Sequence, residues 1–100
     1  LRTREISAVE LTTAFLERID ALEGSSRAWV RLMRDSAMDD AARADRDLGT
    51  GLYRGPLHGI PVGVKDVIDT AGVVTAAGMA IHADRVPAED ATVLRRLRQA

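Results

Sequence analysis

The sequence predicts an α/β chain, because helical and strand-like patterns alternate along its 100 residues. Helical signals occur at about residues 8–22, at about residues 35–48 and after Pro87. Two short apolar segments, residues 28–33 and 62–68, have the composition of strands. Hydrophobic residues make up 46% of the chain but aromatic residues only 3%, so we expect an aliphatic core rich in alanine.

The first predicted helix has the clearest start. Ser7 and Glu10 have the spacing of a capping box, in which each side chain accepts a hydrogen bond from the other residue's backbone amide. Apolar residues follow at helical spacing and form one face: Leu11, Phe15, Ile19 and Leu22. Gly24 is suited to the left-handed conformation that often ends a helix. We therefore expect this helix to end near Leu22.

The second predicted helix has a stripe of mostly small residues, namely Ala37, Ala41, Ala44 and Leu48. Such small side chains permit close helix packing but bury little area, so we expect this helix to be peripheral. In residues 28–33, Trp29 is expected to pack on neighbouring residues as part of a strand. The third helix is expected to start with Asp90 as its N-cap.

Lys65 is the only lysine beside thirteen arginines, and it lies in an apolar, glycine-rich segment. Strand alternation over residues 62–68 places Gly63, Lys65 and Val67 on one face. A desolvated lysine can release its proton, whereas arginine cannot. Spacing alone nevertheless favours an ordinary exposed lysine. A phosphate-binding loop is excluded, because the glycine spacing is wrong and an anion, Asp66, follows the lysine.

Composition excludes several classes of function. The net charge of −1 argues against direct binding of nucleic acid or of an anionic membrane. The chain has no cysteine and only two histidines, so we expect no metal site. His58 is expected to bond to loop backbone rather than to act in catalysis. The sequence has no membrane-spanning run and no signal-peptide pattern, so a cytoplasmic location is expected.

A family resemblance covers most of the chain. Its centre is the segment Gly55–Gly72, GPLHGIPVGVKDVIDTAG, which resembles the start of the amidase signature family. Residues 5–12 and 87–98 are similar to helices that flank this segment in the family. The resemblance implies an α/β fold with a mixed central sheet covered by helices. It also implies that residues 1–100 form the N-terminal part of a single domain that continues beyond residue 100.

The resemblance assigns a role to Lys65. The family uses a triad of a nucleophilic serine, a second serine in a cis peptide linkage and a lysine, and Lys65 matches that lysine. No serine occurs after Ser36, so only one triad member is present and this chain alone is expected to be inactive. The family needs neither a metal nor an organic cofactor.

Gly63 and Asp66 are expected to have supporting roles beside the lysine. Gly63 leaves room for another backbone or a ligand to come close. Asp66 either accepts a hydrogen bond near the lysine or pairs structurally with an arginine. The resemblance adds residues further along the chain. A possible active-site loop includes Thr75, Gly78 and Met79, where Met79 replaces a serine that many family members have.

The implied activity is hydrolysis of the carbon–nitrogen bond of a small-molecule amide. The expected partners are this substrate and the remainder of the same domain, with a homodimer possible and no nucleic acid or membrane bound directly. Two alternatives stay open. One is an amidase-like subunit of a tRNA-dependent amidotransferase, and the other is a non-catalytic truncated product.

Overall fold

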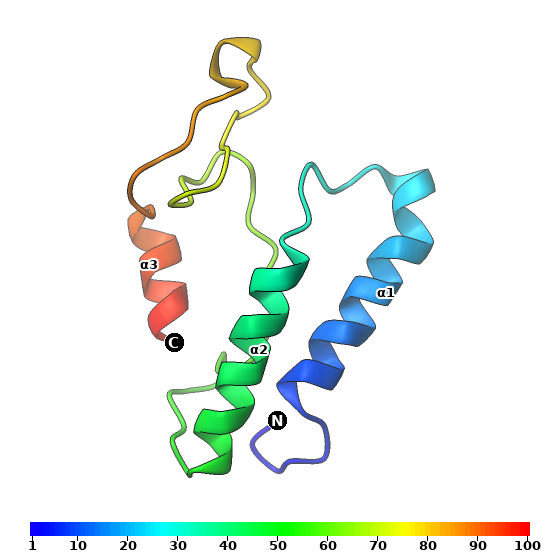
Figure 1. Cartoon of the computed structure of the whole chain (residues 1–100), viewed down its shortest axis with the longest axis vertical. Coiled ribbons are helices and arrows are strands. Elements are labelled where there is room, and N and C mark those ends of the chain that lie inside the picture. The colour runs from blue at the N-terminus through cyan, green and yellow to red at the C-terminus, as the bar shows by residue number, and fades with distance from the viewer. The chain divides into compact units, whose positions relative to one another are not determined.

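A computed structural model describes every residue from Leu1 to Ala100. The helices, joined by turns and irregular segments, are α1 (Ala8–Ser26), α2 (Arg34–Gly49), the 3-10 helix η1 (Ala80–His82) and α3 (Thr92–Gln99) (Figure 1). The chain divides into two compact units, Leu1–Val62 and Gly63–Ala100. The first unit holds α1 and α2, and the second holds η1 and α3. None of the helices is both long enough and apolar enough to cross a membrane.

No β-strand forms, so the predictions of strands at residues 28–33 and 62–68 are wrong for this chain and the expected mixed sheet is not seen. A strand requires a ladder of hydrogen bonds to a neighbouring strand. Near Lys65 the backbone forms one turn bond, from Ile68 N to Lys65 O (2.9 Å), and one isolated bond, from Ala77 N to Asp66 O (3.1 Å). Alternating side chains therefore do not create a strand without a partner.

The start of α1 agrees with the predicted capping box. The Ser7 hydroxyl oxygen accepts from Glu10 N (3.0 Å), and the Glu10 carboxylate accepts from Ser7 N (2.8 Å). The predicted end near Leu22, with Gly24 as the terminating residue, is wrong, because the helix continues to Ser26. It stops where Arg27 adopts a left-handed conformation (φ 46°) and its N–H bonds to Glu23 O (3.0 Å).

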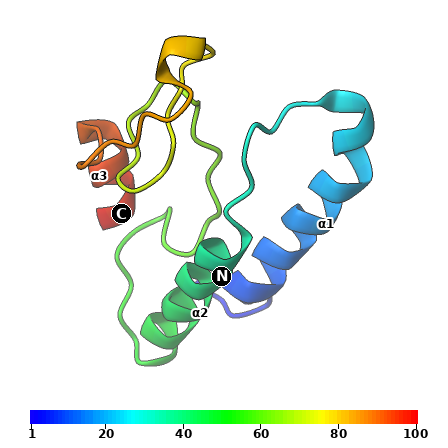
Figure 2. The same cartoon turned by 45° about the horizontal axis from the view of Figure 1, so that its top comes forward.

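In the first unit, α1 and α2 lie side by side and run in opposite directions, as both Figure 1 and Figure 2 show. Their contact is formed by Ala8, Ala41 and Ala44, with Leu1 and Val9 packed against it. The prediction that the second helix is peripheral is therefore wrong. Small side chains bury little area each, but they allow two helix backbones to come close together.

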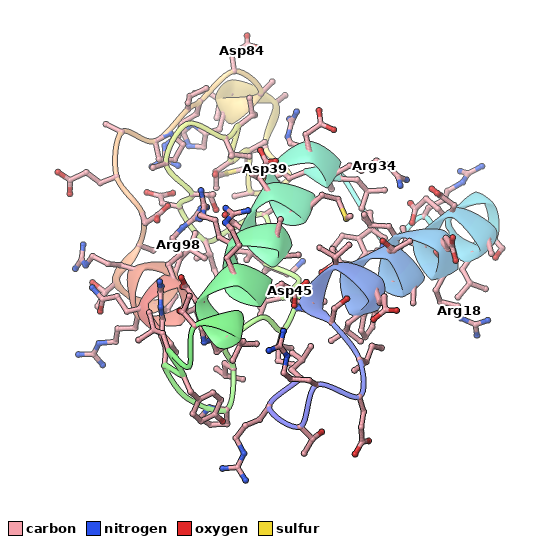
Figure 3. The ribbon with its side chains drawn as sticks, turned by 60° about the horizontal axis from the view of Figure 1, so that its bottom comes forward. Arg18, Arg34, Asp39, Asp45, Asp84 and Arg98 are labelled. Carbon is pink, nitrogen blue, oxygen red and sulfur yellow. The ribbon has the colours of Figure 1, made fainter.

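A carboxylate of α2 caps the N-terminus of α1. The Asp45 oxygens accept from Ala8 N (2.7 Å) and Val9 N (3.0 Å). Figure 3 shows Asp45 on α2 where that helix meets the first turn of α1. These two amides have no partner within the helix, so Asp45 satisfies donors that the buried contact would otherwise leave unbonded.

The segment after α2 contains His58, which is buried. Its Nδ1 accepts from Arg54 N (3.2 Å), and its Nε2 lies 3.7 Å from an Asp47 carboxylate oxygen. This confirms the expected loop histidine that bonds to backbone. Trp29, by contrast, is 39% exposed and belongs to no strand.

The second unit is built mainly from turns and irregular segments, seen from yellow to orange in Figure 2, with α3 at its end. The predicted N-cap is wrong, because α3 starts at Thr92 and is preceded by Ala91 as its N-cap. The Asp90 carboxylate instead accepts from Ala71 N (2.8 Å) and from Arg98 Nε (2.8 Å). One side chain thus joins the turn near Ala71 to the last turn of α3.

Candidate functional site

Lys65 lies in the irregular segment that opens the second unit, and its side chain is exposed. Gly63 and Val67, the neighbours expected on its face, are exposed too. This exposure agrees with what spacing alone favoured, and it differs from the desolvated environment that a proton-accepting lysine requires. The physical reason is the missing sheet: a strand face becomes buried only when other elements pack on it.

Asp66 joins the lysine segment to the predicted loop. Its carboxylate Oδ1 accepts from Ala76 N (3.3 Å), and its backbone carbonyl accepts from Ala77 N (3.1 Å). No arginine pairs with Asp66, so the structural ion pair that we considered is not formed. The residue beside Lys65 is instead bonded at two points to backbone ten and eleven residues further along.

The loop itself contains a tight turn. Ala77 and Gly78 both have positive φ (53° and 70°), and Met79 N donates to Ala76 O (3.0 Å). Positive φ at both central residues is typical of a type I′ turn. Thr75 is buried and its hydroxyl donates to Val73 O (3.2 Å), whereas Met79 is 47% exposed. Of the predicted loop residues, Met79 therefore has the side chain most available to a ligand.

An ion pair that sequence reasoning missed stabilises the same unit. The Arg85 guanidinium donates to both carboxylate oxygens of Asp69 (2.7 and 2.8 Å). These hydrogen bonds hold the pKa of Asp69 below its ordinary value and raise the pKa of Arg85. The pKa of Asp90 is also lowered, in this case mainly by the hydrogen bond that its carboxylate accepts from the Ala71 N–H. Asp69 and Arg85 are 16 residues apart in the sequence, and Ala71 and Asp90 are 19 residues apart. No sequence signal links residues at such separations, which is why both contacts were missed.

The second unit contains the chain's lysine, Lys65, but no serine. All four serines lie in the first unit: Ser7, Ser25, Ser26 and Ser36. In the second unit, the hydroxyls of Thr70 and Thr75 both bond to backbone carbonyls two residues earlier. A nucleophile needs a base within hydrogen-bond reach, and no such pair is present.

Comparison with known proteins identifies the class. Residues 10–100 match the model of the amidase family, so the chain belongs to that family. The resemblance that was based on the segment around Lys65 is thereby confirmed.

Particular relatives support this assignment. The chain is 43% identical over 100 residues to the putative amidase AmiD of Mycobacterium bovis, covering 100% of this chain and 21% of that protein. It is 46% identical over 96 residues to a glutamyl-tRNA(Gln) amidotransferase subunit of Salinispora tropica, covering 96% of this chain and 20% of that protein. The chain thus spans about one fifth of the length of these relatives.

A solved structure is similar as well. The crystal structure of the peptide amidase PAM, in complex with the competitive inhibitor chymostatin, matches with a TM-score of 0.88 and 40% identity. The match covers 98% of this chain and 20% of the peptide amidase chain. The helices and turns described above therefore resemble one part, about one fifth, of the peptide amidase chain.

Proposed function

We propose that the protein containing this sequence hydrolyses the carbon–nitrogen bond of a carboxylic amide, with Lys65 as the proton acceptor. The observation that carries the proposal is the position of the sole lysine. It occupies the lysine position of the segment GPLHGIPVGVKD, within residues that match the amidase family. Similarity to AmiD and to the peptide amidase supports the same reaction.

The proposed mechanism is that of the triad which the resemblance implies. Neutral Lys65 accepts a proton from the bridging serine, which in turn takes the proton of the nucleophilic serine. The nucleophile attacks the amide carbonyl, the amine leaves with a proton, and water hydrolyses the acyl-enzyme. This is the serine–lysine form of nucleophilic catalysis. Both serines would come from residues other than these 100.

The exposure of Lys65 has a consequence for the chain by itself. Removal of water from a lysine favours its neutral amine, which is the form that accepts a proton. Here the side chain is exposed, and no serine lies in its unit. We therefore infer that the 100-residue chain is inactive alone and that further residues of an amidase domain would desolvate the amine.

The test is an amide hydrolysis assay on the full-length protein and on this chain. Lys65→Ala in the full-length protein is expected to lower kcat/KM by at least about a hundredfold, the usual contribution of a general base. Arg96→Ala is the matched control, because it removes an exposed cation from the same unit. Activity retained in a folded Lys65→Ala variant would refute the role of Lys65, and turnover by the 100-residue chain would refute its proposed inactivity.

A second candidate function is that of an amidotransferase subunit. The 46–47% identity to glutamyl-tRNA(Gln) amidotransferase subunits of Salinispora tropica and Chloroflexus aurantiacus favours it. Such a protein would release ammonia from glutamine efficiently only together with its partner subunits. Hydrolysis of simple amides by the purified full-length protein favours the stand-alone amidase, and partner-dependent ammonia release favours the amidotransferase. Absence of both activities would favour the third alternative, a non-catalytic product.

A further inference from the structure

Asp66 is half-buried, and its carboxylate and its backbone carbonyl both bond to the same short stretch of backbone. The carboxylate Oδ1 takes the N–H of Ala76 and the carbonyl takes the N–H of Ala77. Two hydrogen bonds to successive amides fix both the position and the orientation of that stretch. Lys65 is one residue away, about 3.8 Å between consecutive Cα atoms.

The backbone that Asp66 holds is a strained turn. Ala77 has φ 53°, in the left-handed region, which is unfavourable for an L-residue other than glycine. Such a conformation persists only where surrounding bonds determine it. Here those bonds are the two to Asp66, together with Thr75 N to Arg85 O (2.9 Å) and Met79 N to Ala76 O (3.0 Å).

The end of this turn presents an apolar side chain. Met79 is 47% exposed, and two other apolar residues beside Lys65, Val64 and Val67, are 37% and 59% exposed. Methionine is flexible and polarizable, which suits it to contact an apolar ligand group. A turn held against the residue next to Lys65 therefore carries an available apolar contact for a substrate of that lysine.

We propose that Asp66 is a positioning residue, which holds the turn Ala76–Met79 beside Lys65 so that Met79 contacts an apolar acyl group of the substrate. This inference rests on the proposed amidase function. It assigns a substrate class, namely amides with an aliphatic acyl chain, and it separates the residue that accepts the proton from the residue that selects the substrate.

The experiment measures kcat/KM of the full-length protein for hexanamide and for acetamide. Met79→Ser is expected to lower the hexanamide-to-acetamide ratio by about tenfold, since a few methylenes in an apolar contact discriminate at that level. Asp66→Ala is expected to lower the same ratio, because the turn loses the bond from Ala76 N to the carboxylate, while the bond from Ala77 N to the backbone carbonyl remains. Asp66→Asn is expected to keep the ratio within about threefold of the wild-type ratio, because the amide oxygen of asparagine can still accept from Ala76 N.

Asp84→Ala provides the control, since Asp84 is exposed in the same unit, at the corner labelled in Figure 3, and its substitution is expected to leave the ratio unchanged. A ratio unaffected by Met79→Ser would overturn the proposal even if Asp66→Ala failed to fold. Equal ratios for Asp66→Asn and Asp66→Ala would overturn the role of Asp66. If Lys65→Ala abolishes turnover while these ratios stay constant, this inference fails and the proposed function stands.

Discussion

The backbone of Gly59 lies directly against the contact between α1 and α2. Its φ is +81°, and a Cβ atom at this position would lie 3.1 Å from the Cβ of Ala8 and 3.3 Å from the Cβ of Ala44. Both the left-handed conformation and the lack of space therefore require glycine. This explains in physical terms one glycine of the segment on which the family resemblance rests.

Substitution of Gly59 by alanine tests this double requirement. We predict that Gly59→Ala lowers the free energy of unfolding by about 2–4 kcal/mol, from the left-handed backbone and from overpacking together. Gly51→Ala is the matched control, because Gly51 has φ +86° but a Cβ added there would meet nothing within 4 Å, so only about 1–2 kcal/mol of strain is expected. Urea unfolding of the 100-residue chain, followed by circular dichroism, measures both; equal losses would argue against the packing contact.

At the level of elements, the N-terminus of α1 shows which contacts a sequence can reveal. The capping box of Ser7 and Glu10 was predictable, because it depends on a fixed spacing of three residues. The cap by Asp45 was not predictable. Asp45 lies 37 residues after Ala8 and 36 residues after Val9, and it meets their amides only once α2 has packed on α1. The local bond also has an electrostatic effect, since the Ser7 N–H lowers the pKa of Glu10.

Removal of the Asp45 carboxylate is expected to destabilise the helix pair. Ala8 is fully buried, so in Asp45→Ala its N–H would lose its partner, at a cost of about 1–3 kcal/mol. Asp39→Ala removes an exposed acid from the same helix and should change stability by less than about 0.5 kcal/mol. Thermal melts of the two variants give the comparison, and a loss for Asp45→Ala no larger than for Asp39→Ala would contradict the capping role.

Helices and strands differed in how well the sequence predicted them. All three α-helices were expected, because capping residues and apolar spacing act within one segment. Errors there concern ends, such as Gly24, which lies inside α1 instead of terminating it. The segment around Lys65 was expected as a strand from alternation alone, yet a strand depends on a partner segment that alternation does not specify. The same dependence explains why Lys65 is exposed, as spacing alone favoured, because no sheet packs around it.

At the level of the whole molecule, the two units are stabilised differently. The first is centred on packed alanines, whereas in the second Leu94 is the one buried hydrophobic residue. The second unit is held by polar links: Arg85 to the Asp69 carboxylate, Ala91 N to Asp69 O (2.8 Å), and Ala71 N to the Asp90 carboxylate. The stability of the second unit should therefore depend more on the charge of these carboxylates than on any single apolar contact.

Acidification therefore provides a test of the second unit. The pKa values of Asp69 and Asp90 are both lowered in the folded chain from their ordinary value of 3.8, by Arg85 and by the Ala71 N–H respectively. A carboxyl group with a lowered folded pKa contributes its full stabilisation above the unfolded value. That contribution is lost as the pH falls from about 4 through the folded values, where both states become protonated.

We predict that amide signals of Ala71 and Ala91 lose their protection from hydrogen exchange, relative to neutral pH and after correction for intrinsic rates, as the pH falls below about 4. In the double variant Asp69→Asn, Asp90→Asn, protection should be lower at pH 7 and should change less between pH 5 and pH 3, because neither side chain titrates. The Asp69–Arg85 pair is partly exposed, so added salt should weaken its share of the wild-type protection at neutral pH. Protection in the wild-type chain that is equal at pH 3 and pH 7 would show that these carboxylates do not hold the unit together.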